Sequence, residues 1–474
     1  MLPISTLFDL IKTLNKSEKR YFRVAVGDRE PKSYLELYHI LCEWTVLGKE
    51  ELRRLRAKFG HHQLEIARKH LSRVLLSALS RYHASEDAEA LLWERYTGAR
   101  LMYRKGFYDA AARLAEQGMD ASEKTANTHF FALFSYLHLE IGASQKFVGW
   151  DEEALVKAHA VLRQNEEVEE TRRMHASLYE ILLYRYWRNG TVRSQLQKAQ
   201  LNDIMLEEHQ ILRNYSRESF RSTQLHLHFQ SIYFRMTGDW EGSLRVFYAL
   251  DELFQKHPGE WKGSPGDYIQ FLQDVLLTLR SFEAYDEMQY FLTRLKSIPA
   301  SSQAEKSRME FMLAEHDLHI ALAMGSADYP RVIPVFNDRL QWHDQIQWKF
   351  TLARFHYFRK DYPAALQLVN ELLLSPETAL GKQNYSKIRI LLLMIHQAMD
   401  NRDYLFYELR SFERKMKKGE DWHTTEELVT DYFRHWLSFR PMDRLYDRLT
   451  QVLENPYERV MVSELGLKQW FKMD

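Results

Sequence analysis

The sequence has very few of the residues that cross-link or interrupt a chain. Cys42 is the only cysteine among 474 residues, so no disulfide can form within the chain. This usage is typical of proteins kept in a reducing compartment, and we expect a cytoplasmic location. Proline and glycine number only 11 and 18, fewer than average usage would give, which favours helices over a turn-rich β fold.

Long apolar runs and an excess of one charge are also missing. No stretch approaches ~18 uncharged apolar residues, so we expect no membrane span, and the N-terminal residues do not resemble a signal peptide. The 65 basic residues balance 65 acidic residues, so the net charge does not call for nucleic acid or an anionic membrane surface. Hydrophobic residues make up 45% of the chain and aromatic residues 13%, which is enough to build a folded core.

Helical periodicity dominates the first part of the chain. An apolar stripe within residues 5–14 predicts a helix, and Asn15 followed by Glu18 predicts the capped start of another. Two further helices are predicted at 48–58 and 62–83, separated by a glycine. We therefore predict that residues 1–90 form a helical N-terminal segment or cap.

Residues 48–83 raise the alternative of a DNA-binding helix-turn-helix, because arginines lie near both predicted helices. The second helix, however, carries an apolar set that indicates burial in a core: Leu64, Ile66, Ala67, Leu71, Val74 and Leu75. We therefore expect nucleic acid not to be a partner. A regulator whose N-terminal segment contacts DNA stays open as the second hypothesis.

A recurring turn marks the chain from about residue 91 onward. FRMTGDWEGSLRVF at 234–247 has relatives in YRKGFYDAAARLA at 103–115 and YFRKDYPAALQLV at 357–369. Each has a short polar or glycine turn, then an aromatic residue with a small residue three positions later. Glycine ends a helix at low cost in a left-handed conformation, and aspartate caps the next helix. We predict the tight turn of a helical hairpin at each stretch.

The spacing of these turns predicts the architecture. Strong and weaker marks together recur about every 42 residues, at Tyr108, Trp150, Val192, Trp240, Tyr285, Tyr329, Tyr362 and Tyr404. One hairpin cannot bury its apolar face alone, whereas stacked hairpins bury a continuous core. We predict an all-α fold in which residues 91–474 form a right-handed superhelical solenoid of antiparallel hairpins, preceded by the segment 1–90.

These marks resemble the tetratricopeptide repeat family. That family has a small residue in the first helix, a Gly-Asp-Tyr-like turn, an early alanine in the second helix and often a closing proline. The matching positions are the turns at 106–108, 238–240 and 360–362, with Ala99, Ser231, Ala353, Pro258 and Pro376. The opening LIKTLNKSEKRYF is also similar to that of a group of uncharacterised bacterial tetratricopeptide-like proteins. The period near 42 departs from the family's 34, so we expect longer helices.

The resemblance implies a protein-binding scaffold or adaptor with a concave groove lined by the first helix of each hairpin. The register of the turns then places a mostly basic and aromatic set in the groove: Arg100, Tyr103, His228, Arg235, Arg280, Arg354, Tyr357, Arg389 and His396. Arginine offers paired donors to carboxylates. We therefore expect a protein or peptide partner that presents an acidic segment or a C-terminal carboxylate.

Signatures of catalysis are missing from the sequence. It contains no glycine-rich phosphate loop, no nucleophile elbow and no zinc-protease motif, so we expect no catalytic residues, no cofactor and no enzyme activity. The histidine pairs at 61–62, 226 with 228 and 316 with 319 come nearest to metal-ligand spacing. Twenty histidines make such pairs common by chance, and we expect no metal site.

Two functions remain after these exclusions. The leading hypothesis is a scaffold or adaptor that binds a peptide on the concave face. The alternative is a transcriptional or signalling regulator that combines a peptide-sensing repeat domain with the helix-turn-helix-like N-terminal segment. The sequence leaves the oligomeric state open.

Overall fold

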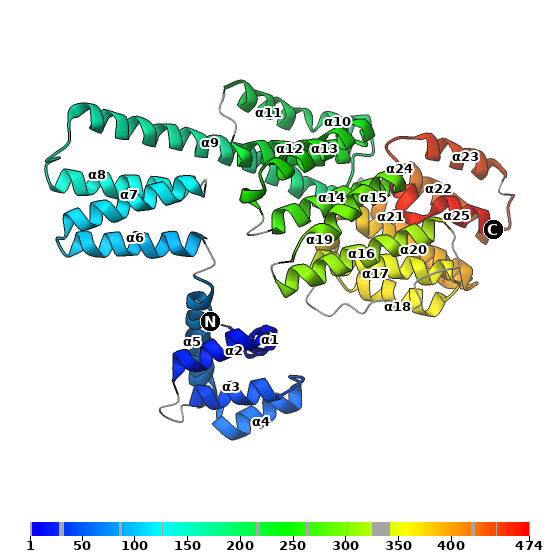
Figure 1. The fold of residues 1–474 in the computed structure, drawn as a ribbon. Helices are drawn as coiled ribbons and strands as arrows, with labels where there is room; N and C mark the ends of the chain where they lie inside the picture. Colours follow the sequence, from blue (N-terminus) through cyan, green and yellow to red (C-terminus); the bar gives the residue numbers. More distant parts are fainter. Residues whose placement is uncertain are drawn as a thin grey trace. The chain divides into compact units, whose positions relative to one another are not determined.

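The computed structural model is all-helical, and its described residues contain no strand (Figure 1). The structure describes residues 2–27, 33–84, 88–125, 127–214, 219–261, 265–300, 302–324, 342–418, 422–441 and 443–473. The chain divides into two compact units, Met1–Glu166 and Glu167–Asp474. The division expected at residue 90 lies inside the first unit, and a separate segment 1–90 stays a prediction.

The helices of the first unit are α1 (Ile4–Thr13), α2 (Lys16–Val26), α3 (Ser33–Glu43), α4 (Lys49–Phe59), α5 (His61–His83), α6 (Ala88–Arg104), α7 (Tyr108–Lys124) and α8 (Thr128–Ser144). The long helix α9 (Glu152–Asn189) contains the boundary between the units.

The helices of the second unit are α10 (Gln195–Ala199), α11 (Asn202–Asn214), α12 (Phe220–Thr237), α13 (Trp240–Lys256), the short η1 (Pro258–Glu260), α14 (Gly266–Ser281), α15 (Tyr285–Ser297), α16 (Gln303–Met324), α17 (Trp342–Phe358), α18 (Tyr362–Leu373), α19 (Glu377–Leu380), α20 (Lys382–Ala398), α21 (Arg402–Lys418), α22 (Thr424–Leu437), α23 (Asp443–Glu454), α24 (Arg459–Leu465) and α25 (Leu467–Met473).

The N-terminal helices α1 to α5 share one apolar core. The predicted cap of α2 is present, because the Asn15 side chain accepts from the Glu18 amide at 2.8 Å and the Glu18 carboxylate accepts from the Asn15 amide at 2.7 Å. Helix α5 buries Leu64, Ala67, Leu71 and Leu75 against this core. The expectation that Ile66 belongs to the buried face is wrong: its side chain is exposed, because it lies about 200° around the helix from Leu64.

The turn at Gly238-Asp239-Trp240 has the predicted hairpin geometry. Gly238 ends α12 in the left-handed conformation with φ 73°, and the Asp239 side chain caps α13 by accepting from the Gly242 amide at 2.8 Å. Ser243 is fully buried, so a small side chain is what allows α12 and α13 to pack closely. The Gly-Asp-Trp interruption is therefore the corner of a helical hairpin.

Other predicted marks fall at comparable corners. Tyr108, Tyr285 and Tyr362 begin α7, α15 and α18, and the small residues Ala111 and Ala365 are fully buried where the paired helices meet. The weaker mark at 192 lies in the link after α9 rather than at the head of a long helix, and the mark at 329 lies outside the described residues. The hairpins are thus present, while their regular stacking with a period of 42 stays a prediction.

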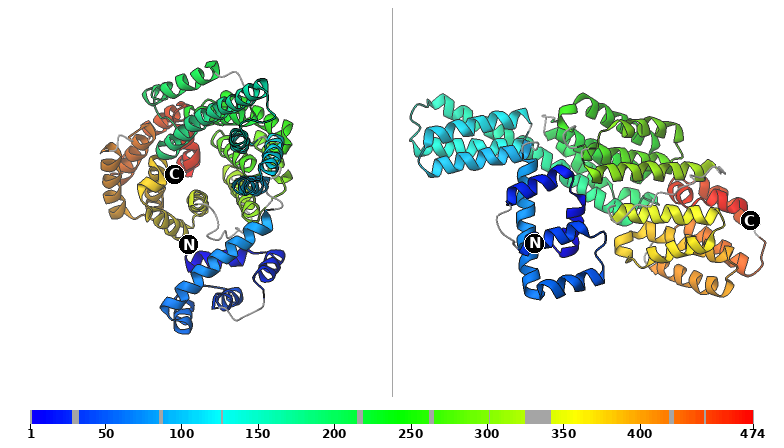
Figure 2. Two further views of the ribbon diagram at one scale, coloured as in Figure 1. Left: turned by 90° about the vertical axis from the view of Figure 1, so that its left-hand side faces the viewer. Right: turned by 60° about the horizontal axis from the view of Figure 1, so that its bottom comes forward.

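Helix α24, the last but one of the described helices, packs inside the second unit against α14 and α20. Figure 2 shows this helix, in red, between the green and the yellow helices. Hydrogen bonds hold the C-terminal segment there: Arg459 donates to the Phe282 carbonyl at 3.0 Å, and Gln469 donates to the Leu322 carbonyl at 2.7 Å. The chain's own C-terminal segment therefore packs against the first helices of two hairpins. The resemblance predicts that these helices line the groove.

The end of α9 meets the start of α20. The Gln383 side chain accepts from the Thr191 amide and donates to the Thr191 hydroxyl, both at 2.9 Å. A side chain at Gly381 would collide with the Trp187 carbonyl, because an added Cβ would lie 2.4 Å from that oxygen. This contact brings Trp187 beside α20, where it lines the cavity described below. None of the helices in the described part of the chain is long and apolar enough to cross a bilayer.

Candidate functional site

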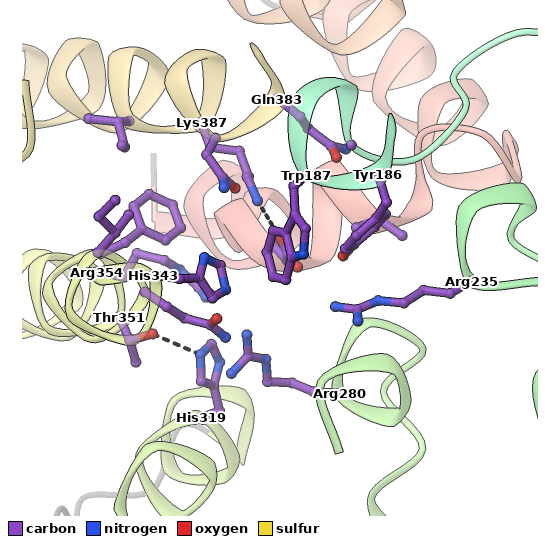
Figure 3. A pocket seen from close by; sticks show the side chains of 18 residues that line it. Tyr186, Trp187, Arg235, Arg280, His319, His343, Thr351, Arg354, Gln383 and Lys387 are labelled. Carbon is purple, nitrogen blue, oxygen red and sulfur yellow. Dashed lines mark hydrogen bonds and ion pairs between the residues drawn. The ribbon is translucent and has the colours of Figure 1, made fainter. Parts of the chain in front are cut away.

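The second unit contains a basic cavity of about 70 Å³, lined by the ends of α9, α12, α14 and α16 together with α17, α20 and α24 (Figure 3). Its described lining carries one acidic residue, Glu464, and four strongly basic ones: Arg235, Arg280, Arg354 and Lys387. A neighbouring cavity of about 240 Å³ shares Arg280, His319, Arg354 and Glu464 with the first.

The register of the hairpins explains how three arginines reach this place. Arg235 and Arg280 each lie five residues before the aromatic residue of their turn, and Arg354 lies eight before its own. Positions three residues apart share one face of a helix. All three are therefore on the inner face of the first helix of a hairpin, and Figure 3 shows Arg235 and Arg280 extending toward the space beside Trp187.

Two of these arginines already have acidic neighbours. Arg280 Nη1 lies 3.0 Å from Glu315 Oε1, and Arg235 Nη1 lies 3.8 Å from Asp274 Oδ1, with its guanidinium 4.5 Å from the centroid of the Tyr186 ring. Burial raises the pKa of Glu315 and of Asp274 against the opposing pull of the arginines. These two carboxyl groups lie outside the lining of the cavity and hold the two guanidinium groups in place.

Lys387 pairs with Glu464 of α24. Burial acts to raise the pKa of Glu464, but the charges of Lys387 and Arg280 outweigh it and lower that pKa to about 2. Glu464 therefore remains ionised at neutral pH. The cavity thus already holds one carboxylate against a lysine, and this carboxylate comes from the chain's own C-terminal segment.

Arg354 differs from the other cations because it has no hydrogen-bond or ion-pair partner among the described residues. Its side chain is buried, and its Nε atom lacks a partner. Burial first, and the charge of Arg280 second, lower its pKa to about 10, so it is charged at neutral pH. Gly466, with φ 68°, lets the corner between α24 and α25 pass close by: an added Cβ there would lie 3.3 Å from Arg354 Nη2.

The histidines of the cavity are neutral at pH 7. Burial and the nearby arginines lower the pKa of His319 well below its usual range and that of His343 to about 4. His319 Nε2 lies 3.0 Å from the Thr351 hydroxyl, which lies 3.3 Å from Glu315 Oε1. The single hydroxyl proton of Thr351 is satisfied by the carboxylate, so His319 donates to the hydroxyl oxygen. This arrangement fixes a histidine and does not pair a nucleophile with a base.

Six of the nine residues predicted for the groove do not line this cavity. In the first unit, Arg100 pairs with Glu140 at 2.6 Å and the Tyr103 hydroxyl bonds the Ser144 hydroxyl at 2.8 Å. These contacts join α6 to α8 and do not form part of the basic cavity.

The other four belong to the second unit and are engaged between helices. His228 is buried against the rings of Tyr179 and Phe271. Tyr357 packs on Tyr362 at its own hairpin corner. Arg389 pairs with Glu408, and the ring of His396 lies 3.9 Å from that of Tyr404. Helix packing uses these side chains, whereas the register of the turns alone placed them in a groove.

Several cavity residues were not predicted from the sequence. Lys387 lies two positions from the expected stripe on α20, Trp187 lies at the end of a helix that carries no hairpin turn, and Glu464 lies in the C-terminal segment that packs inward. Only Trp187 carries a usable signal, because it lies five residues before the weak mark at 192, as Arg235 and Arg280 lie five residues before theirs. The other two enter through contacts between distant parts of the chain.

The comparisons with known proteins add no relative: no family model, curated protein or solved structure matches this chain.

Proposed function

We propose that the protein is a non-catalytic binding protein of the tetratricopeptide-like kind whose second unit takes a carboxylate of a protein or peptide partner into the basic cavity. One observation carries the proposal: at the cavity wall, Arg354 is a buried, charged guanidinium with no hydrogen-bond or ion-pair partner among the described residues. An unpaired buried charge destabilises the folded protein. Binding of an anion beside this charge would offset that penalty.

The chemistry of the wall favours a carboxylate. A guanidinium presents a planar fork of donors that matches the two oxygens of a carboxylate. The ion pair of Lys387 with Glu464 supports this, because it already places one carboxylate of the chain beside a cation of the cavity. A space of about 70 Å³ has room for a few water molecules, or for one such group in their place. The chain end or an acidic side chain of a partner fits that size, whereas an extended helix does not.

The cavity is also pre-formed. Glu315 and Asp274 hold Arg280 and Arg235, and the guanidinium of Arg235 is stacked on Tyr186. Binding to groups that are already ordered loses little side-chain entropy. This supports a scaffold or adaptor, which we place in the cytoplasm because of the scarcity of cysteine.

The proposal is tested from the ligand's side with a positional-scanning library of octapeptides that carry free C-terminal carboxylates. The selected peptide is then compared with its amidated form and with a form in which each Asp and Glu is replaced by its amide. We expect one of these two changes to weaken binding at least tenfold, because it removes the group that Arg354 receives. Equal affinity for all three peptides, or selection of peptides without any dependence on carboxylates, would contradict the proposal.

A further inference from the structure

A second cluster of functional side chains lies in the same unit, away from the residues that line the basic cavity. His175 of α9, Glu208 of α11 and His226 of α12 meet at one point, and their ligand atoms all lie within 4.8 Å of one another. His175 and Glu208 are buried, and the His226 side chain keeps 17% of its surface exposed. Three different helices thus direct nitrogen and oxygen donors at one small volume.

The separation of His175 from Glu208 suits a shared metal ion. His175 Nδ1 lies 3.2 Å from Glu208 Oε1 and 3.3 Å from Oε2, and His226 Nδ1 contacts Oε1 of the same carboxylate. Ligands about 2.1 Å from a tetrahedral zinc ion lie roughly 3.4 Å from each other. The two imidazole rings are inclined by 60° with centroids 5.7 Å apart, so both can turn a nitrogen toward a common centre.

The charges of the cluster also call for a cation. Among the described residues, Glu208 makes ion pairs with these two histidines and with no lysine or arginine. A buried carboxylate without a permanent cation is the electrostatic setting that a divalent metal neutralises.

We propose that His175, Glu208 and His226 form a binding site for a divalent transition metal, with zinc as the best match to two imidazoles and one carboxylate. Three protein ligands leave a fourth position, which the partial exposure of His226 leaves open to water or to a ligand atom. Borderline ions such as Zn²⁺ and Co²⁺ prefer this donor set, whereas Mg²⁺ and Ca²⁺ prefer oxygen ligands alone.

The sequence predicts no metal site, because ligand spacing can be recognised only in pairs that are close in sequence. His226 and His228 point to different sides of α12, as their spacing predicts: one faces Glu208 and the other packs on Phe271. The partners of His226 lie 51 residues before it and 18 residues before it, at spacings that form no recognised motif. A metal here would tie α11 to α9 and α12.

The test is metal titration of the full chain, first freed of metal by a chelator. Isothermal titration with Zn²⁺ measures stoichiometry and affinity, and Co²⁺ gives absorption bands that report nitrogen and oxygen coordination. The variants are Glu208→Gln and His226→Gln, which keep size and polarity. His209→Gln is the matched control, because His209 is an exposed histidine next to Glu208 on the same helix. Circular dichroism checks that all four proteins have the same helix content.

We expect one Zn²⁺ per chain for the wild type and for His209→Gln, with at least tenfold weaker binding in both site variants and loss of the Co²⁺ bands. Two results would overturn the proposal: a wild type that shows no saturable binding of one ion, or a Glu208→Gln variant with unchanged affinity. Because His226 lies at the edge of the core, His226→Gln decides the matter if Glu208→Gln fails to fold.

Discussion

A single residue, Arg354, carries most of the functional argument. Its neighbours Arg280 and Arg235 each have a carboxyl within 4 Å, whereas Arg354 has no such partner in the described part of the chain. Burial lowers its pKa to about 10, which means that the folded protein disfavours this charge while still carrying it at pH 7. The charge is thus disfavoured in the free protein, and under the proposed function its role is to receive the carboxylate of a partner.

Replacing Arg354 by methionine should therefore stabilise the free protein. Arg354→Met removes a desolvated charge and leaves no carboxylate behind without a partner, so we expect the free energy of unfolding to rise by roughly 1–3 kcal/mol. Urea unfolding followed by tryptophan fluorescence measures this. Arg359→Met, which removes an exposed charge just beyond the same helix, is the control and should change stability by less than about 0.5 kcal/mol. A marked loss of stability in Arg354→Met would show that the guanidinium has a structural partner after all.

At the scale of elements, a buried ion triad fastens the link after α9 to the C-terminal helices. Arg193 Nη1 lies 2.6 Å from Glu426 Oε1 of α22, and its Nη2 contacts Glu458, which precedes α24. Ser386 and Thr425 donate to the same two carboxylates at 2.6 Å. Burial would lower the pKa of Arg193, but the two carboxylates outweigh it and raise that pKa. Arg193 with its two carboxylates and Arg354, which has no ion-pair partner among the described residues, thus differ sharply in their surroundings.

Arg193→Met should destabilise the fold strongly, in contrast to Arg354→Met. Removing the cation leaves two buried carboxylates facing each other, which typically costs about 3–5 kcal/mol. Scanning calorimetry of the full chain measures the loss. Arg188→Met is the matched control, since Arg188 is partly exposed and, among the described residues, its side chain donates to the Thr378 carbonyl and has no acidic partner. A stability change for Arg193→Met no larger than that of the control would refute the structural role of the triad.

The stability contributed by the packing of α24 should depend on pH through Glu464. Its pKa is lowered from 4.5 to about 2 in the folded protein, so its contribution is fully present above the unfolded pKa and is lost as pH falls through about 2. The difference corresponds to roughly 3 kcal/mol, at 1.36 kcal/mol per pKa unit. Glu464→Gln should be less stable than wild type by up to that amount at pH 7.

Unfolding of both proteins by urea at a series of pH values checks this prediction. The stability gap between wild type and Glu464→Gln should narrow steadily as pH falls from 4.5 toward 2, because protonation abolishes the same charge that the substitution removes. A gap that stays constant over this range would mean that the substitution acts through packing and that the carboxylate charge does not hold α24.

At the scale of the whole molecule, local sequence patterns predicted the helices and the turns between them. They did not predict which distant helices pack together. The cap at Asn15 and the corner at Gly238-Asp239-Trp240 follow from a few adjacent residues, and such signals can be read directly. The register of the turns also predicts that Arg235, Arg280 and Arg354 lie on the same face of their helices, and all three line one cavity. The boundary at residue 166 within the long α9 has no such signal, because a helix continues through it.

The remaining features arise from contacts between residues far apart in sequence. The inward packing of α24, the junction of Thr191 with Gln383, and the cluster of His175 with Glu208 and His226 join separate helices. No local pattern specifies which distant side chains will meet. For this reason six predicted groove residues lie elsewhere, while Lys387 and Glu464 were not predicted.

The most direct test of the central claim is a comparison of peptide affinity between wild type, Arg354→Met and Arg359→Met. The probe is the carboxylate-bearing octapeptide selected from the library, titrated by fluorescence anisotropy at one fixed salt concentration. The account predicts that Arg354→Met weakens binding by tenfold or more, which is about 1.4 kcal/mol or more, although this variant is the more stable protein, and that Arg359→Met binds as the wild type does. Unchanged affinity in a folded Arg354→Met would contradict the account, because the unpartnered arginine would then have no part in recognition.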